Sequence, residues 1–477
     1  SAVLKSSLKS SLEKLECHFT WTLLEEDVDL DELEETVGYQ IKFFTESNIQ
    51  NYNLMSYICH LKKSNEEALK NLQKAEEEVQ KNHPDEIARR SLVTWGNYAW
   101  VCYHLERYEE AQSYINKVEN SGKELSSTAQ WKIELPEIWA EQGWALIKWG
   151  KKYFERAKNC FENALKKEPD NPEFNAGYAT AMYRLEECFY RQCEHETLSL
   201  EPLKRAVELN PKDTFLMALL ALKLQDLNQD DEGERYIEEA MQKTPCSPYA
   251  LRYAAKFYRR KGEVDKAMEI LKRALTVTPD STFLHHQLGL CYRNKLFQLK
   301  MSTRYPPQEQ VEELIQLAIY HFKIMTDRKT KFYRAHIDLA KMYAEAKRYE
   351  EAEEAFQKAS QINILSNVDK QQLCYLYGNF QRFHVKSESE AIGYYIKGMK
   401  IQKDSYFFYK CRDALKKMLQ QRIQRGLGDA TVFGTLGFIS SLSSEKHEAI
   451  EYYEKAVALN PDNEEYLSAL CGLRLSL

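Results

Sequence analysis

The sequence lacks any long apolar segment. Its mean hydropathy is −0.60, and no run approaches the roughly 18 consecutive apolar residues that a membrane-crossing helix needs. The opening residues, SAVLKSSLKS, also lack the apolar core of a secretory signal peptide. We therefore expect a chain that neither crosses a membrane nor carries such a signal.

Catalytic signatures are also missing. The sequence contains no GxxxxGK phosphate-binding loop, no HExxH metal motif, no nucleophile elbow and no paired CxxC motif. Its 11 cysteines are scattered and odd in number, which predicts free thiols in a reducing compartment and a cytoplasmic location. Together these absences favour a binding protein over an enzyme.

What the sequence does contain is a recurring helical pattern, Ala-x-x-x-(Phe/Tyr/Leu/Ile)-x-x-Ala. Small residues let two helices pack closely, and the larger residue between them fills the gap. Several copies are followed by a proline, which predicts the end of the second helix. The clearest copies are Ala68/Leu72/Ala75, Ala157/Phe161/Ala164, Ala267/Leu271/Ala274, Ala352/Phe356/Ala359 and Ala449/Tyr453/Ala456, and the prolines are Pro169, Pro211, Pro245, Pro279 and Pro461.

The spacing of the copies identifies the repeat. Corresponding small residues stand at 206, 240 and 274, and again at 325 and 359, a period of about 34 residues that is typical of tetratricopeptide repeats. The sequence therefore predicts an all-α superhelix of tetratricopeptide repeats, an α-solenoid. Longer intervals elsewhere predict inserted helices that close the superhelix around a positively charged central groove or tunnel.

Three regions follow from this pattern. We expect an N-terminal tetratricopeptide array over residues 1–245. Central repeats over 246–325 are predicted to line the groove, and a C-terminal array is predicted over 326–477. Repeat arrays of this kind expose long concave surfaces that bind other molecules.

The charge is distributed unevenly along the chain. The net charge of −6 by itself argues against binding of nucleic acid. The distribution of charge over the surface is a better guide to such binding than the net charge. The stretch 249–261 holds five basic residues and no acidic one. A second basic cluster follows near the C-terminal end, where it predicts either an extension of a nucleic-acid track or a solvated helix face: Arg412, Lys416, Lys417, Arg422 and Arg425.

Helical phase separates two faces of the 249–261 segment. Leu251, Ala255 and Tyr258 form the packing face of the repeat, so the basic residues fall on a separate stripe. Cations beside aromatic rings suit the phosphates and bases of single-stranded nucleic acid. A solvated face and a clamp for peptide carboxylates are the alternatives. The stripe is Tyr249, Arg252, Lys256 and Arg259, and the same offsets in the next unit give Phe283, His286, Leu290 and Arg293.

Longer sequence words resemble one known family, the interferon-induced proteins with tetratricopeptide repeats. The resemblance runs over essentially the whole chain and continues to its last residues, LRLSL. The words that carry it are LECHFTW (15–21), RSLVTWGNYAW (90–100), GWALIK (143–148), LLALKLQD (219–226), RYAAKFYRRK (252–261) and LHHQLGLCY (284–292).

The resemblance implies a cytoplasmic antiviral protein of innate immunity. Such a protein binds the 5′ end of foreign single-stranded RNA in a narrow basic tunnel and sequesters it, and it recognises a 5′-triphosphate. The alternatives are a binder of incompletely methylated capped RNA and a tetratricopeptide adaptor for antiviral signalling proteins. Association with other family members is a further expectation.

The resemblance also implies that an N-terminal helix, Asp31–Lys42, is threaded into the groove of the N-terminal array, and it assigns site residues. Those implied to bind the 5′-triphosphate are Thr36, Gln40, Lys148, Arg184, Tyr249, Arg252 and Gln287. Those implied to contact the rest of the RNA end are Trp144, Phe154, Lys256, Arg259, Phe283, His286 and Phe332. No cofactor is required, but the resemblance ties Glu32 to a Mg²⁺ ion that bridges the phosphates. An ordinary acid at a helix start, stabilised by the helix dipole, is the alternative for Glu32.

Two positions depart from the family pattern. Thr36 stands where relatives that accept a capped end carry arginine, and Phe154 replaces a tyrosine, so its ring remains but the hydroxyl is lost. Trp144, which is able to stack on a cap base, is present. The threonine favours the type of site that takes an uncapped triphosphate.

Overall fold

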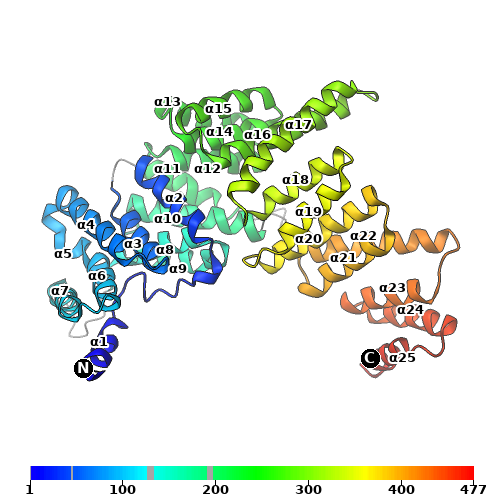
Figure 1. Cartoon of the computed structure of the whole chain (residues 1–477), viewed down its shortest axis with the longest axis horizontal. Coiled ribbons are helices and arrows are strands. Elements are labelled where there is room, and N and C mark those ends of the chain that lie inside the picture. The colour runs from blue at the N-terminus through cyan, green and yellow to red at the C-terminus, as the bar shows by residue number, and fades with distance from the viewer. Residues whose placement is uncertain (1, 44–46, 126–133, 191–196, 477) are drawn as a thin grey trace. The chain divides into compact units, whose positions relative to one another are not determined.

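The computed structural model describes residues 2–43, 47–125, 134–190 and 197–476 (Figure 1). Over these ranges the chain consists of helices joined by turns and contains no strand, which confirms the predicted all-α fold. Contacts between residues divide the chain into two units, Ser1–Asn294 and Lys295–Leu477. The division into three regions expected from the repeat pattern stays a prediction.

The first unit contains most of the predicted site residues. Helix α16 (Thr282–Ser302) includes the boundary between the two units. The helices before it are α1 (Ala2–Leu12), α2 (Leu30–Phe43), α3 (Ile49–Leu61), α4 (Asn65–Asn82), α5 (Ile87–Arg90), α6 (Leu92–His104), α7 (Tyr108–Leu125), α8 (Pro136–Trp149), α9 (Phe154–Lys167), α10 (Pro172–Leu185), α11 (Leu200–Leu209), α12 (Thr214–Asp226), α13 (Asp230–Lys243), α14 (Pro248–Lys261) and α15 (Val264–Val277).

The second unit continues the same pattern of paired helices. They are α17 (Gln308–Arg328), α18 (Tyr333–Glu345), α19 (Tyr349–Ser360), α20 (Asn367–Phe380), α21 (Glu388–Ile401), α22 (Tyr406–Gln424), α23 (Ala430–Leu442), α24 (Lys446–Leu459) and α25 (Glu464–Leu475). Short 3₁₀ turns form at η1 (Glu25–Asp27), η2 (Pro84–Glu86) and η3 (Lys151–Tyr153), and π-helical turns form at η4 (Glu186–Tyr190) and η5 (Gln381–Val385).

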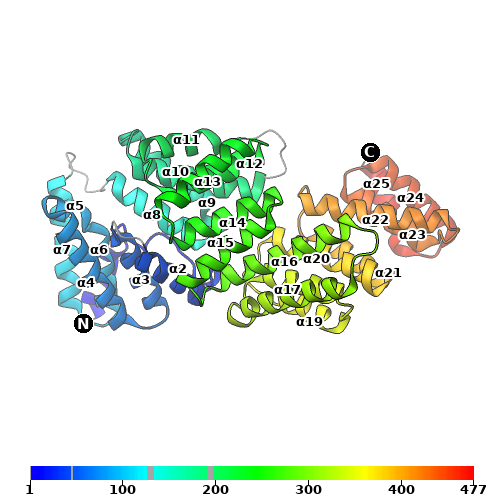
Figure 2. The ribbon, with the colours of Figure 1, turned by 90° about the horizontal axis from the view of Figure 1, so that it is seen from above.

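Within each unit, consecutive helices pack as hairpins. The pairs α3/α4, α6/α7, α8/α9, α12/α13 and α14/α15 lie side by side in the first unit, and α18/α19, α20/α21 and α23/α24 do so in the second (Figures 1 and 2). These are the helix pairs of tetratricopeptide repeats, as the sequence predicted.

Phe161 shows how the repeat signature packs. Its side chain and those of Ala157 and Ala164 on α9 are fully buried. A Cβ atom added at Gly143 of α8 would stand 2.6 Å from the Phe161 ring, and one added at Gly177 of α10 would stand 2.1 Å from it. Both contacts are shorter than any real Cβ contact, so the ring occupies space that only glycine leaves open on the two neighbouring helices.

Each predicted proline follows the end of a helix. A proline lacks the N–H that would continue the backbone hydrogen bonds, and it disfavours helical geometry in the residue before it. The five helices α9, α11, α13, α15 and α24 end at Lys167, Leu209, Lys243, Val277 and Leu459, each two residues before its proline.

Caps fix the two helices that supply most of the basic site residues. Asn171 caps α10 by accepting hydrogen bonds from the backbone N–H groups of Glu173 and Phe174. Ser247 caps α14 by accepting from Ala250, and Gly262 ends that helix with φ = 91°. Side-chain acceptors at the first position and glycine after the last are the usual limits of a helix.

Helix α2 forms where the threaded helix was predicted. It buries Leu33 and Val37, and it packs against α3. Lys62, which follows α3, binds Asp31 at 2.7 Å and Glu34 at 2.5 Å. No helix among the described residues is long and apolar enough to cross a membrane.

Candidate nucleic-acid interface

Three cations of the first unit converge on one tyrosine, Tyr253 of α14. Arg184, near the end of α10, donates from Nη2 to the Tyr253 hydroxyl at 3.1 Å, and the Arg252 guanidinium lies 5.7 Å from the ring centroid. Tyr253 is only 5 % exposed. Burial alone would raise the pKa of this phenol, but the charges of Arg184, Arg252 and Lys256 lower it below its ordinary value. The positive field at Tyr253 therefore outweighs the cost of burial.

Arg252 also contacts a ring of the next repeat. Its guanidinium lies 4.9 Å from the centroid of Phe283 on α16. The side chains of Arg252 and Phe283 are both half-buried. Helices α14 and α16 thus place a guanidinium beside an aromatic ring, the combination that the sequence pattern predicted for a phosphate next to a base.

One carboxylate shares this site with the cations. Glu187, in the π-helical turn η4, accepts a hydrogen bond from Lys256 Nζ at 3.0 Å, and its other oxygen lies 3.7 Å from Arg184 Nη1. Burial would raise the pKa of Glu187, but Lys256 and Arg184 lower it to about 2. The carboxylate is therefore ionised at neutral pH. We call Arg184, Arg252, Lys256, Tyr253 and Glu187 the Tyr253 cluster.

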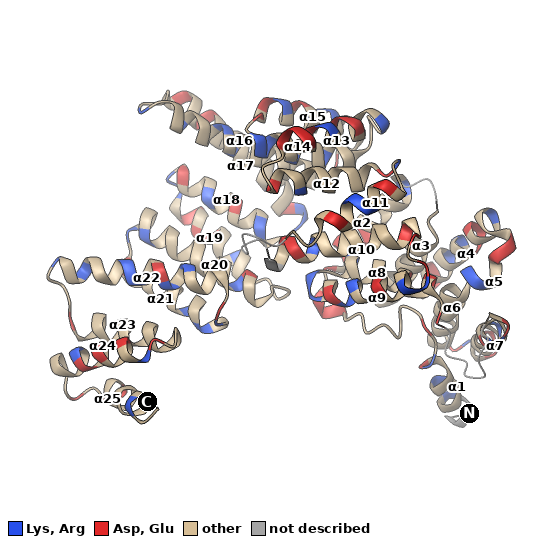
Figure 3. Cartoon of the chain, turned by 180° about the vertical axis from the view of Figure 1, so that it is seen from behind, with Lys and Arg blue, Asp and Glu red and all other residues tan. Residues whose placement is uncertain are grey.

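The stretch 249–261 is free of acidic residues in the sequence but not in space. Neighbouring helices bring carboxylates to three of its cations: Lys256 pairs with Glu187, Arg260 with Asp226 at 3.1 Å, and Lys261 with Glu234 at 2.5 Å. Acidic and basic residues are both spread over the helices of the chain (Figure 3). Among the described residues, no carboxylate forms such an ion pair with Arg252, whose guanidinium lies near the rings of Tyr253 and Phe283.

Lys148 of α8 is held by a different helix. Its Nζ donates to Asn51 Oδ1 on α3 at 2.7 Å. Burial lowers the pKa of Lys148 to about 8, and the nearby Glu141 opposes this shift. Glu141 is itself buried and accepts a hydrogen bond from Asn53 at 2.7 Å, and burial raises its pKa to about 7. The charge on Lys148 thus depends on pH close to neutrality.

Tyr39 of α2 and Tyr249 at the beginning of α14 interact electrostatically. Burial raises the pKa of Tyr249 to about 12, and the nearby phenol of Tyr39 on α2 adds to this shift. Thr36 and Gln40, which lie on the same helix, are half-buried, and the Thr36 hydroxyl donates to the carbonyl of Glu32 at 2.9 Å. The threading of α2 into a groove stays a prediction.

Among the remaining predicted residues, Arg259 and Gln287 are neighbours. Arg259 Nη2 donates to Gln287 Oε1 at 3.5 Å, which joins α14 to α16. His286 precedes Gln287 on α16 and is buried. These contacts extend the predicted surface from the Tyr253 cluster along α16.

The predicted aromatic contacts differ in exposure. Phe154 opens α9 and is only 7 % exposed, so its ring is mostly covered by protein. Trp144 is half-buried and meets Phe161 edge to face, with ring centroids 5.4 Å apart. Phe332 precedes α18 in the second unit. The assignment of these three rings to RNA stays a prediction.

The predicted metal ligand, Glu32, belongs to no group of three candidate metal ligands among the described residues. Glu32 lies in the first turn of α2, where its backbone N–H donates to Asp29 Oδ1 at 3.3 Å. The described residues contain no group of three His, Cys, Asp or Glu side chains able to hold a metal ion. Mg²⁺ is often bound by one or two carboxylates together with phosphate oxygens and water. Glu32 fits a Mg²⁺ ion only where phosphates supply further ligands.

Sequence reasoning missed three residues of this region. Tyr253 lies four residues after Tyr249 and Glu187 three after Arg184, so helical spacing could have indicated both. Asn51 comes from α3, far along the chain from Lys148. No local pattern links Asn51 to Lys148.

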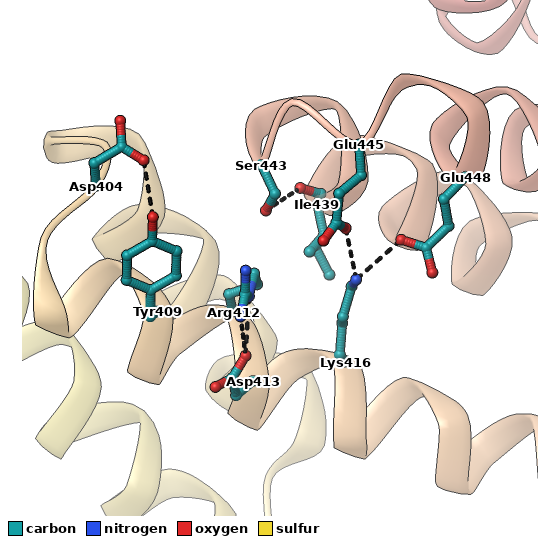
Figure 4. Close-up of polar contacts among 9 residues, drawn as sticks. All are labelled: Asp404, Tyr409, Arg412, Asp413, Lys416, Ile439, Ser443, Glu445 and Glu448. Atoms are coloured by element: carbon teal, nitrogen blue, oxygen red, sulfur yellow. Dashed lines mark hydrogen bonds and ion pairs between the residues drawn. The ribbon is translucent and has the colours of Figure 1, made fainter.

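The second basic cluster, on α22, is held by acidic partners (Figure 4). Lys416 Nζ lies 2.8 Å from Glu445 and 3.0 Å from Glu448, and Arg412 pairs with the adjacent Asp413 at 2.9 Å. Both carboxylates that bind Lys416 come from the α23/α24 hairpin or the turn within it. We therefore interpret this part of the cluster as an ion-paired helix face.

The paired helices and their packing signature define a tetratricopeptide-repeat protein. Models of the tetratricopeptide repeat match residues 250–283, 321–363 and 430–463. The chain is 46 % identical over 462 residues to the antiviral innate immune response effector IFIT1 of Macaca fascicularis, covering 96 % of this chain and 97 % of that protein. It is 42 % identical over 461 residues to the human interferon-induced protein with tetratricopeptide repeats 2, covering 95 % and 96 %. The chain belongs to the family of interferon-induced proteins with tetratricopeptide repeats.

Solved structures agree with this assignment. The human IFIT1 dimer with PPP-AAAA matches with a TM-score of 0.82 at 44 % identity. The human IFIT1 dimer with m7Gppp-AAAA matches with a TM-score of 0.84 at 45 % identity. Each comparison covers 95 % of this chain and all of the solved chain.

Proposed function

We propose that this protein is a cytoplasmic antiviral effector that binds the 5′-triphosphate end of foreign single-stranded RNA and sequesters that RNA. The convergence of Arg184, Arg252 and Lys256 on Tyr253 is the observation that supports the proposal most strongly. A triphosphate concentrates several negative charges, and guanidinium groups bind phosphate oxygens through paired hydrogen bonds. The related human IFIT1 has been solved with PPP-AAAA.

The proposed pocket draws on residues from five helices. Lys148, Arg184 and Arg252 supply positive charge from α8, α10 and α14, and Tyr249 and Gln287 supply hydrogen-bonding groups. Helix α2 contributes Thr36 and Gln40. In this proposal Glu32 would hold a Mg²⁺ ion, which would neutralise part of the charge of the phosphates.

A capped RNA end is the second candidate ligand. The human relative has also been solved with m7Gppp-AAAA, and Trp144 offers a ring that is half-buried. Thr36 supplies no positive charge where relatives that accept a cap are implied to carry arginine, so we expect the triphosphate to bind more tightly. We also propose that the protein associates with members of its own family, because human IFIT1 has been solved as a dimer with each of these two RNA ends.

A binding comparison tests this proposal. Gel shifts would use one single-stranded RNA sequence prepared with a 5′-triphosphate, an m7G cap or a 5′-hydroxyl, and a blunt duplex of the same sequence. We expect the triphosphate RNA to bind most tightly and the duplex most weakly, because the predicted contacts reach phosphates and ring faces. Equal affinity for triphosphate and hydroxyl ends would contradict the proposal and favour the adaptor function.

A further inference from the structure

We infer that Glu187 limits the affinity of this site, because its carboxylate competes with RNA phosphates for Lys256 and Arg184. The inference rests on the proposed function and names a residue that sets how tightly the site holds RNA. Two observations support it: the position of the Glu187 carboxylate, and the contacts that anchor the backbone of the η4 turn.

The anchor is the neighbouring residue, Glu186. Its carboxylate forms an ion pair with Lys223 of α12 and accepts hydrogen bonds from the backbone and hydroxyl of Ser199. The side chains of Glu186 and Lys223 are each 8 % exposed. Breaking a buried ion pair is costly because it leaves a charge without compensation. This pair therefore fixes the start of the η4 turn.

Glu187 lies on the other side of the same turn, toward the cations. One of its oxygens lies 3.0 Å from Lys256 Nζ and the other lies 3.7 Å from Arg184 Nη1, and the side chain is 25 % exposed. The two cations come from α14 and α10. A single carboxylate thus bridges two helices in the way that two oxygens of one phosphate group would.

The carboxylate cannot withdraw far when RNA arrives. Because Glu186 holds the η4 backbone, only the side-chain torsions of Glu187 are able to move its charge. A phosphate that binds Lys256 must replace the carboxylate and then remains close to it. Like charges at such distances repel, and partial burial weakens the screening by salt. Removal of this one negative charge should therefore increase affinity for RNA.

The test compares two variants that each remove one negative charge. Glu187→Gln keeps the shape of the side chain and an oxygen that accepts from Lys256. Glu234→Gln is the matched control, because Glu234 binds Lys261 on the same helix, α14, outside the Tyr253 cluster. Affinity for a single-stranded 5′-triphosphate RNA would be measured by gel shift at several salt concentrations, with thermal unfolding to check folding.

We expect Glu187→Gln to tighten binding about three- to tenfold, and Glu234→Gln to change it less than about twofold. The slope of log affinity against log salt should become steeper for Glu187→Gln by about one RNA phosphate contact, as an additional phosphate gains an uncompensated cation. Glu187→Asp keeps the charge on a side chain that is one methylene shorter, so it should gain clearly less affinity than Glu187→Gln, which separates charge from packing if Glu187→Gln folds poorly.

Four results would overturn the inference, and the last of them would overturn the proposed function as well. Unchanged or weaker binding by Glu187→Gln would mean that Glu187 positions the cations. An equal gain in Glu234→Gln would mean that net charge alone controls affinity, and a gain in Glu187→Asp as large as that of Glu187→Gln would exclude the charge. If wild type shows no preference for the triphosphate end while Glu187→Gln still binds RNA more tightly than wild type does, that result would refute the proposed function alone. Absence of RNA binding by both proteins would overturn both.

Discussion

The two basic clusters of this chain differ in how their charges are compensated. In the Tyr253 cluster, one carboxylate, Glu187, is shared by Lys256 and Arg184. In the α22 cluster, Lys416 alone has two carboxylates, Glu445 and Glu448. At Tyr253 the cations therefore outnumber the carboxylates, whereas the carboxylates around Lys416 outnumber that cation.

This difference shows that the number of basic residues is a poor guide to an anion site. The positions of the acidic residues on neighbouring helices decide which cations remain available to a ligand. Arg412 and Arg422 of α22 have their own partners, Asp413 at 2.9 Å and Glu388 at 3.8 Å. We therefore expect RNA to depend on α14 and its neighbours rather than on α22.

The largest expected effect concerns salt. About four to five cations of the predicted site neutralise RNA phosphates, so affinity for triphosphate RNA should fall roughly fiftyfold between about 50 and 200 mM salt. Gel shifts over a series of salt concentrations measure this slope, and Lys416→Met should leave it unchanged. A flat response would mean that the cations near Tyr253 do not bind phosphates.

The next effect concerns Arg252. Arg252→Met should weaken binding of triphosphate RNA about tenfold or more, because a charged hydrogen bond to the phosphates is lost. Hydroxyl-ended RNA should lose much less, because it leaves the triphosphate pocket empty. Thermal unfolding is the control, and we expect little change because Leu251, Ala255 and Tyr258 are buried and carry the packing. Equal losses for the two RNAs would make Arg252 a general backbone contact.

A smaller effect concerns pH. Lys148 has a pKa lowered to about 8 by burial, so the lysine is charged below that pH and becomes neutral above it. An anion binds the charged form, so affinity for triphosphate RNA should fall about fivefold between pH 7 and pH 9. Lys148→Arg keeps its charge over this range and should remove most of the dependence. If the affinity of Lys148→Arg falls by the same factor between pH 7 and pH 9, another titratable group causes the pH dependence.

The stability effect has the opposite sign. The pKa of Lys148 is lower in the folded chain than its ordinary value of 10.5, so the unfolded chain holds this proton more tightly between those two values. The contribution of Lys148 to the free energy of unfolding should therefore rise with pH from about 8 to 10.5. Chemical denaturation of wild type and Lys148→Met at both ends of that range measures it.

The smallest effect concerns the α22 cluster. Lys416→Met should leave triphosphate RNA binding within about twofold of wild type and should lower the free energy of unfolding by at most about 1 kcal/mol, since its carboxylate partners are well exposed to solvent. Gel shift and denaturant titration measure the two quantities. A loss of affinity as large as that of Arg252→Met would restore α22 as part of an RNA track.

Much of the fold was predictable because its signals are local. Ala157, Phe161 and Ala164 stand at helical spacing on one helix, and their burial confirms the repeat pattern. The prolines predicted the helix ends for a reason that is also local, because a proline lacks the backbone N–H that would continue a helix. The site was less predictable, since Lys256 meets Glu187 across 69 positions and Lys148 meets Asn51 across 97. Such pairings depend on how repeats stack, which no single helix encodes.

The packing of Phe161 has a consequence for RNA binding. Its ring leaves no space for a methyl group at Gly177, so Gly177→Ala would push α10 away from α9. Arg184 lies seven residues further along α10, two turns away on the same side of the helix. A single added carbon, on a residue with no charge and no hydrogen-bonding side chain, would therefore shift one guanidinium of the Tyr253 cluster. In this stacked architecture the spacing of the helices is part of the recognition of the ligand.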